Sequence, residues 1–290
     1  MQLGPSELIL NADGSIYHLN LVPADLARTV ITVGDPDRVS DVSQCFDTIE
    51  LKKGKREFIT HTGTLNGKRL SVISTGIGTD NVDIVLNELD ALVNVDFENR
   101  VVKADKTSLD IVRIGTSGAV QSAIEIDSFL ISEFAMGFDG VLHTYQSDHV
   151  QHKPISDAFV KHTDWSTDKA LPYVVKCDDR LANQLASNRI RFGLTATNIG
   201  FYGPQGRKLR LDLADESLKS KITSFAYDSL KITNLEMETS AIYGLSKLLG
   251  HRAVSMNCIL ANRETGAFSK NPKKAVDELI TYTLQKLTSQ

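Results

Sequence analysis

The chain has 290 residues, 41% of them hydrophobic, and its 32 Lys and Arg against 36 Asp and Glu give a formal net charge of −4. This apolar fraction excludes intrinsic disorder, and the negative charge without basic runs argues against sequence-independent nucleic-acid binding. No apolar run reaches the roughly 18–20 residues that span a bilayer, and the N-terminus lacks the basic and apolar regions of a signal peptide. With three scattered cysteines, these features predict a soluble cytoplasmic protein that binds neither nucleic acid nor membrane and has no disulfide framework.

Short β-rich runs alternate with helix-like segments along the whole chain. The predicted strands are 29–33, 70–74, 110–114, 128–132, 191–197 and 253–260, and the clearest predicted helices are 79–93, 238–249 and 272–287. This alternation favours an α/β sheet covered on both faces, with ligands bound at the carboxyl ends of its strands. We expect one domain over residues 1–290, with 1–17 as an N-terminal extension. The polar segments 94–109 and 142–175 are expected to be irregular and to lie at the surface.

Two glycine-containing turns that follow predicted strands could bind an oxyanion such as phosphate. Gly34 precedes a helix start, where unpaired N–H groups and the side chain of Arg38 suit an anion. Arg113 and Thr116, in the glycine-rich sequence RIGTSG, form a second candidate cradle. On local pattern alone, the first turn is equally well explained as a plain strand-to-helix connection with Asp35 as its cap.

Two further groups carry polar side chains that could bind a ligand. Glu236 and Glu238 bracket a methionine where a helix begins, so one carboxylate could face a ligand while the other is structural. A carboxylate in that position is also a common helix cap. In the sequence FYGPQGR, Phe201 offers an aromatic face, and Gln205 and Arg207 match the edge of a pyrimidine. The alternative for this loop is an ordinary Gly-Pro surface turn.

Other recognisable patterns point away from bound cofactors. The sequence TGIG at 75–78 is half of a dinucleotide fingerprint, but GxGxxG is absent, which argues against a nicotinamide cofactor. His143, His149 and His152 lie close together without supporting cysteines or paired carboxylates. We interpret them as loop histidines rather than as zinc ligands.

Taken in chain order, the motifs resemble those of the nucleoside phosphorylase family, and within it the uridine phosphorylases. The resemblance covers about residues 18–288 and rests on GDPDR at 34–38, REF at 56–58, TGIG at 75–78, RIGTSG at 113–118, FYGPQGR at 201–207, EMET at 236–239 and ANR at 261–263. It implies a single-domain, three-layer α/β/α fold with a mixed, barrel-like central sheet. It also implies reversible phosphorolysis of uridine to uracil and ribose 1-phosphate, a pentosyltransferase reaction of pyrimidine salvage with inorganic phosphate as co-substrate and no cofactor.

The resemblance also assigns roles to individual residues. For phosphate it implies Gly34, Arg38, Arg113, Thr116 and, from a neighbouring subunit, Arg56. For ribose it implies Met237, Glu238 and the neighbour's His18. For the base it implies Phe201, Gln205, Arg207 and Arg263. Catalysis would fall to Arg38, Arg113, Glu238, Gln205 and Arg207. The implied assembly is a homodimer with shared active sites, and the resemblance leaves a trimer of dimers open.

Two departures from the family pattern affect these expectations. Asn81 stands where certain relatives have a serine that helps bind a monovalent cation beside the residue matching Glu57, so that cation site is left open. The sequence LANR at 260–263 lacks the aspartate of purine-cleaving relatives, which favours uridine. The alternatives are a purine or broad-specificity phosphorylase, a phosphate-independent nucleosidase, and a nucleoside-binding protein without catalytic activity.

Overall fold

The computed structural model describes residues 2–289 as an alternating succession of strands and helices. The strands are β1 (Thr29–Val33), β2 (Thr48–Lys55), β3 (Phe58–Leu65), β4 (Lys68–Ser74), β5 (Val95–Asp96), β6 (Val101–Val102), β7 (Asp110–Ala119), β8 (Phe129–Gly137), β9 (Tyr173–Lys176), β10 (Ile190–Thr197), β11 (Ala226–Tyr227), β12 (Leu230–Glu236), β13 (Arg252–Asn262) and β14 (Ala267–Phe268). The helices are α1 (Pro36–Ser43), α2 (Thr79–Asn94), α3 (Lys153–Thr163), α4 (Asp179–Leu185), α5 (Leu218–Ser224), α6 (Thr239–Leu248) and α7 (Pro272–Thr288). Short 3₁₀ helices are η1 (Pro23–Asp25), η2 (Val141–Thr144), η3 (Asp148–Val150) and η4 (Gly203–Gln205).

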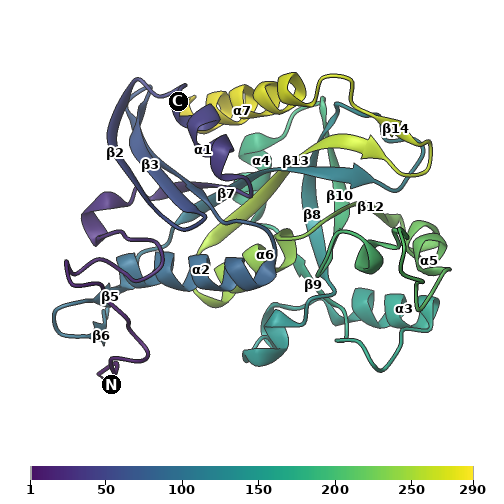
Figure 1. The fold of residues 1–290 in the computed structure, drawn as a ribbon, viewed down its shortest axis with the longest axis horizontal. Coiled ribbons are helices and arrows are strands. Elements are labelled where there is room, and N and C mark those ends of the chain that lie inside the picture. The colour runs from purple at the N-terminus through teal and green to yellow at the C-terminus, as the bar shows by residue number, and fades with distance from the viewer. Residues whose placement is uncertain (1, 290) are drawn as a thin grey trace.

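The central sheet is mixed and partly closed into a ring. Its strands follow the order β11-β12-β10-β8-β13-β7-β1-β4-β3-β2, and β12 also pairs with β7. This antiparallel pairing, with Asn234 opposite Ala119 and Leu235 opposite Gly118, closes the ring β7, β13, β8, β10 and β12. Helices α1 and α7 lie on one side of the sheet and α2 and α6 on the other (Figure 1). The predicted three-layer α/β/α fold with a barrel-like sheet is confirmed.

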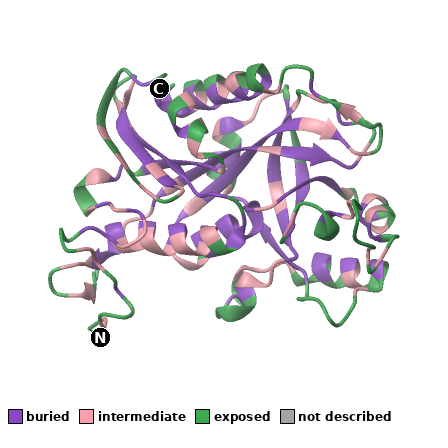
Figure 2. Cartoon of the chain, viewed as in Figure 1, coloured by how far each residue is buried: buried purple, intermediate pink, exposed green. Residues whose placement is uncertain are grey.

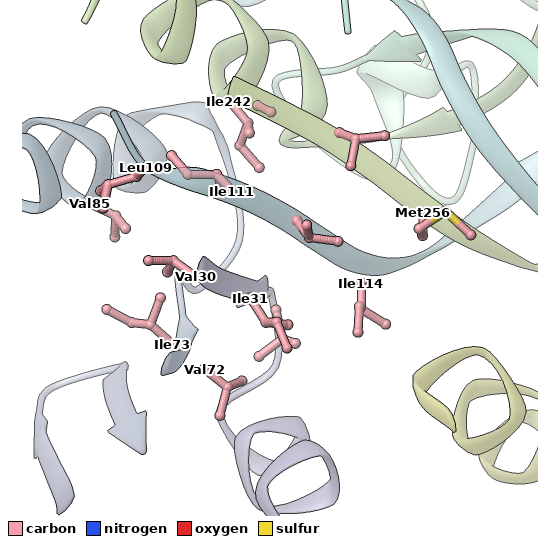
Figure 3. Close-up of a cluster of buried hydrophobic side chains, with 14 of the residues drawn as sticks. Val30, Ile31, Val72, Ile73, Val85, Leu109, Ile111, Ile114, Ile242 and Met256 are labelled. Carbon is pink, nitrogen blue, oxygen red and sulfur yellow. The ribbon is translucent and has the colours of Figure 1, made fainter. Parts of the chain in front are cut away.

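Strand β1 shows why the sheet needs helices on both faces. All of its residues are buried, and its side chains alternate between the two faces of the sheet. Val30 and Ile73 lie beside Val85 of α2, whereas Ile31 and Val72 point to the opposite side (Figure 3). Burial therefore continues through the sheet, and exposed residues lie on the loops, on β2 and on the outer sides of the helices (Figure 2). None of the helices in residues 2–289 combines the length and apolar character that a membrane crossing requires.

A second, smaller hydrophobic cluster lies under α3 and α5. Trp165 packs against Phe138 with ring centroids 5.0 Å apart, and Phe159 lies between Phe138 and Phe225 at 5.3 and 5.1 Å. The cluster also includes buried side chains of β10 and β12. Phe138 and Trp165 also line a hollow with Ile199 and Pro204, so the cluster lies beside the loop that follows β10.

The prediction that 142–175 is irregular is wrong for part of that segment. Helix α3 and strand β9 lie within it, and β9 pairs with β8. The helix buries Ile155, Phe159 and Thr163, which repeat every four residues on one face. The polar residues between them mask this spacing, which is why the composition of the segment suggests a loop.

Strand β7 extends beyond its predicted end at Gly115. Residues 115–119 continue the parallel pairing with β13, with Gly115 opposite Asn257. The glycine-rich sequence RIGTSG therefore lies within the sheet and not in a turn after it. By contrast, the turn after β1 is the strand-to-helix connection that the sequence suggests, because Asp35 accepts a hydrogen bond from the Asp37 N–H at 3.0 Å and Pro36 begins α1.

Candidate active site

A cavity of about 960 Å³ opens at the carboxyl ends of β1, β4, β7, β12 and β13. Its size falls within the range of roughly 300–1,000 Å³ that is usual for small-molecule sites. Most residues singled out from the sequence line it: Gly34, Arg38, Glu57, Arg113, Thr116, Phe201, Gln205, Arg207, Met237, Glu238 and Arg263. The fold thus brings motifs from distant parts of the chain to one place, and what each residue binds stays a prediction.

The guanidinium of Arg113 lies buried between two carboxylates. Its Nη2 is 2.7 Å from Glu238 Oε2 and 3.2 Å from Glu236 Oε2. Its Nη1 donates to Asn257 Oδ1 at 3.2 Å and to Ser255 Oγ at 3.3 Å, both on the neighbouring strand β13. A buried charge needs such partners, because it has lost its hydration. These contacts fix the position of the guanidinium at the wall of the cavity.

The two glutamates belong to the turn that joins β12 to α6. Glu236 is the last residue of β12 and Glu238 immediately precedes α6, while Met237 between them is half-buried and lines the cavity. The Gly78 N–H donates to Glu238 Oε1 at 3.0 Å. Glu236 Oε2 instead accepts the backbone N–H groups of Glu238 and Thr239, both at 2.9 Å. Both carboxylates reach Arg113 and both line the cavity, so which of them faces a ligand stays a prediction.

Burial and neighbouring charges oppose each other in this cluster. Burial would lower the pKa of Arg113, but Glu236 and Glu238 outweigh it and the pKa is raised. Burial raises the pKa of Glu238, Arg113 opposes this shift, and Glu236 adds to it. Burial lowers the pKa of Arg38, and the positive charge of Arg113 lowers it further. An arginine still carries its proton at neutral pH, so the cavity keeps both cations.

The end of the cavity near α1 can hold an oxyanion. Gly34 follows β1, and Arg38 lies in the first turns of α1 with its Nη1 3.4 Å from the carbonyl oxygen of Ile114. Thr116 is half-buried on β7 and lines the same cavity. A guanidinium, a hydroxyl and the N–H groups of a helix start are suitable donors for phosphate oxygens.

The loop between β10 and α5 supplies a different chemistry. The Arg207 guanidinium carbon lies 3.9 Å from the centroid of the Phe201 ring, and Nη1 donates to the Phe201 carbonyl at 2.7 Å and to Gln205 Oε1. Gln205 is buried, and Arg263 donates to its backbone carbonyl at 2.5 Å. Burial and the charge of Arg263 lower the pKa of Arg207 to about 10, so Arg207 remains a cation near neutral pH. The loop presents a fixed amide beside an aromatic ring.

His18 and Arg56 do not line the cavity of their own chain. Glu88 of α2 holds His18, since its Oε1 is 2.6 Å from His18 Nδ1 and its Oε2 accepts the Leu19 N–H at 2.9 Å. Arg56 is exposed at the tip of the β2–β3 hairpin, where its φ is 57°. That both residues enter the site of a neighbouring subunit stays a prediction.

Whether Glu57 helps to bind a monovalent cation stays a prediction, and its surroundings argue against it. Asn81 Nδ2 donates to Glu57 Oε1 at 3.2 Å, so an N–H group, which cannot ligate a cation, contacts this carboxylate oxygen. The backbone at Gly76 packs against both side chains, because an added Cβ would lie 2.5 Å from Asn81 Nδ2. Within residues 2–289, no group of three or more His, Cys, Asp or Glu side chains is arranged to hold a metal ion.

Several residues of the site were missed in the sequence. Ser255 and Asn257 hold Arg113 from β13, and Thr197 donates to Glu236 Oε1 at 2.5 Å from the end of β10. The only signal was polar residues at alternate positions of otherwise apolar strands, a pattern that a solvent-facing edge strand would also produce. Their partners lie far away in the sequence, since Ser255 and Asn257 contact Arg113 and Thr197 contacts Glu236, so spacing could not connect them.

Comparison with known proteins finds relatives of this chain by sequence and by structure. The family model of the Phosphorylase superfamily matches residues 28–288. The chain is 31% identical to a uridine phosphorylase of Thermococcus kodakarensis, covering 90% of this chain and 83% of that protein. It is 23% identical to a DeoD-type purine nucleoside phosphorylase of Listeria welshimeri, covering 86% and 88%. A crystal structure of a Trypanosoma brucei nucleoside phosphorylase described as showing uridine phosphorylase activity superposes with a TM-score of 0.85, at 27% identity over 98% and 100% of the chains.

Gly115→Ala should displace Arg113 and weaken phosphate binding. A Cβ at this position would lie 1.9 Å from Arg113 Nη1, and the guanidinium cannot move without leaving its carboxylates. We expect a loss of at least about tenfold in phosphate affinity by calorimetry, as for a lost hydrogen bond to a charged group. The control is the same change in an Arg113→Gln background, where it should add nothing. Unchanged affinity, or an equal loss in both backgrounds, would contradict the account.

Replacing potassium by a large organic cation at constant ionic strength should not change the midpoint of thermal unfolding. A cation present at 100 times its Kd would stabilise the protein by about 2.7 kcal/mol, which such a measurement detects readily. The matched variant is Asn81→Ser, which removes the amide that contacts Glu57. If potassium stabilises the Asn81→Ser variant alone, the Asn81 amide of the unmodified protein occupies the position at which the cation binds. Stabilisation of the unmodified protein would show that the site is occupied after all.

Proposed function

The chain belongs to the phosphorylase superfamily, and we propose that it is a uridine phosphorylase, a pentosyltransferase that converts uridine and phosphate to uracil and ribose 1-phosphate. The observation that carries this proposal is the composition of one cavity. Arg38, Arg113 and Glu238 lie in its wall together with Gln205 and Arg207. Phosphate, ribose and a pyrimidine therefore each find suitable partners in a single pocket.

The reaction requires little covalent chemistry from the protein. An oxygen of phosphate attacks C1′ of the ribose, the bond from C1′ to N1 breaks, and its electron pair leaves with the uracil. The ribose passes through an oxocarbenium-like transition state, as in other glycosyl transfers. Each arginine contact to phosphate at ~4 Å is worth about 4 kcal/mol at an effective dielectric constant near 20, before desolvation. Arg38 and Arg113 would thus position the nucleophile, and the bound anion would stabilise the cationic sugar.

The base loop supports uracil as the leaving group. Because Gln205 Oε1 accepts from Arg207 and Gln205 itself is buried, the amide has a fixed orientation with its Nε2 side left to donate. Uracil leaves with negative charge on its carbonyl oxygens, and donors placed at that position stabilise the transition state. Gln205, Arg207 and Arg263 would supply them, with Phe201 packing on the ring.

The purine alternative has less support from the residues at the end of β13. Asn262 is buried and stabilises the neighbouring backbone, because its Nδ2 donates to the Gln121 and Ile124 carbonyls at 3.0 and 2.7 Å. Residues 260–263 offer no carboxylate that could protonate a purine. Pyrimidine salvage and a cytoplasmic location belong to the same proposal.

We also propose that the enzyme acts as a homodimer with shared sites. Arg56 and His18 lie outside the cavity of their own chain, and Arg56 projects from an exposed hairpin tip where a second subunit can reach it. A third arginine from a neighbour would add to the attraction for phosphate.

Uracil release from uridine, followed by ultraviolet absorbance with and without phosphate, tests the proposed reaction. We expect release that depends on phosphate, together with little cleavage of inosine. Release at full rate without phosphate would identify a nucleosidase. Cleavage of inosine alone would mean that the base loop is wrongly interpreted, and no turnover of either substrate would favour a binding protein.

Mixing two inactive variants tests the shared site. Arg38→Ala and Arg56→Ala should each lose phosphorolysis, yet a heterodimer contains one site with both arginines. After subunit exchange, about a quarter of the unmodified activity should return, since half of the dimers are mixed and half of their sites are intact. The control mixture is Arg38→Ala with Glu238→Ala, whose residues belong to the same subunit's cavity. Equal recovery in both mixtures, or none despite heterodimers seen by mass spectrometry, would contradict sharing.

A further inference from the structure

The carboxylate of Glu236 is held from several directions at once. Its Oε2 accepts from the N–H groups of Glu238 and Thr239 at 2.9 Å and from Thr239 Oγ1 at 2.8 Å, and it lies 3.2 Å from Arg113 Nη2. Its Oε1 accepts from Thr197 Oγ1 at 2.5 Å. Only 5% of the residue is exposed. Glu236 is therefore a rigid part of the protein.

Glu238 is held by fewer contacts than Glu236, although both carboxylates meet the same nitrogen of Arg113. Its carboxylate meets Arg113 Nη2 at 2.7 Å and the Gly78 N–H at 3.0 Å. If Glu238 binds ribose hydroxyls and Arg113 binds phosphate, as the proposed function requires, their mutual contact has to weaken when substrates enter. The guanidinium would then keep only one of its two carboxylate partners, and that partner is Glu236.

Thr197 connects the same carboxylate to the loop that carries the base-binding residues. Its Oγ1 accepts the Ser240 N–H at 3.0 Å while donating to Glu236, so it joins the end of β10 to the start of α6. The next residue, Asn198, donates its N–H to the Glu236 carbonyl at 2.9 Å. The elements that carry the proposed phosphate, ribose and base contacts thus meet at Glu236.

We propose that Glu236 is a positioning residue that holds the Arg113 guanidinium and the start of α6 in place while Glu238 exchanges Arg113 for the ribose hydroxyls. This role rests on the proposed function. Glu236 acts as the permanent counter-charge, and Glu238 acts as the exchangeable one. The active site can then bind substrates without leaving a buried cation unpaired, which would be costly in the protein interior.

Glu236→Gln tests this role, because it keeps the size of the side chain and removes its charge. The expected result is a kcat lowered by about 10- to 100-fold, as for hydrogen bonds to charged groups. The pH profile provides a second readout. Burial and Glu236 raise the pKa of Glu238, whereas Arg113 and the Gly78 N–H oppose this. Without the Glu236 charge, the acid limb of the kcat profile should move to lower pH relative to the unmodified enzyme.

Two further variants separate positioning from simple loss of structure. Glu236→Asp restores the charge and should leave the acid limb at its original position, with part of kcat recovered. Thr197→Val removes one donor to Glu236 and should lower kcat less, by about two- to tenfold. It also keeps the proposal testable if Glu236→Gln fails to fold.

The outcomes distinguish this proposal from the proposed function. An unmodified enzyme that does not cleave uridine with phosphate would overturn the proposed function itself. If it does cleave uridine, a folded Glu236→Gln variant with nearly unchanged kcat and an unmoved acid limb would overturn the positioning role. If Glu236→Gln does not fold, an unchanged kcat in the Thr197→Val variant would overturn the positioning role as well.

Discussion

The architecture of the site depends on one buried cation between two buried carboxylates. Arg113 comes from β7, Glu236 and Glu238 come from the β12–α6 turn, and the remaining partners of Arg113 come from β13. For these groups to meet, β12 must lie close to β7, although β10, β8 and β13 separate the two strands along the sheet. The β7–β12 pairing that closes the ring provides this proximity. A flat sheet with the same strand order would leave the charges apart, and each would then be buried without a partner.

This arrangement also limits what Arg113 can do for an anion. With both carboxylates ionised, the group of three side chains carries a formal charge of −1, so the two carboxylates offset the attraction of Arg113 for phosphate. Arg38 supplies the compensating positive charge from α1, and its own pKa is lowered by burial and by Arg113. A further arginine from a neighbouring subunit would strengthen the attraction. The proposed sharing of sites is thus consistent with the charge balance within one chain.

The sequence predicted the regular parts of the fold because their signals are local. Strand β1 is a short run of buried β-formers, and α2 and α7 show the helical period over many residues. The predicted end of β7 comes too early because Gly115 suggests a turn. Pairing with β13, which is far away in the sequence, keeps the chain extended beyond Gly115. Helix α3 was missed because its buried face consists of only a few side chains among polar ones.

The site was harder to predict than the fold. The motifs identified the residues that line the cavity, since each contains its own chemical signal. They gave no indication that Glu236 and Glu238 share one guanidinium, or that Thr197 and Asn257 complete the network, because these contacts join positions far apart in the sequence. The orientation of the Gln205 amide likewise depends on the three-dimensional position of Arg207.

The second hydrophobic cluster provides this protein with an intrinsic fluorophore. Trp165 is the single tryptophan of the chain, and it packs against Phe138 and Phe159 beside the loop that follows β10. Its fluorescence therefore reports on that part of the molecule alone, while backbone circular dichroism reports on the whole sheet. The two signals coincide during unfolding if the smaller cluster and the main core melt together. They separate if the base-binding side of the molecule opens first, which makes local opening visible without any added chromophore.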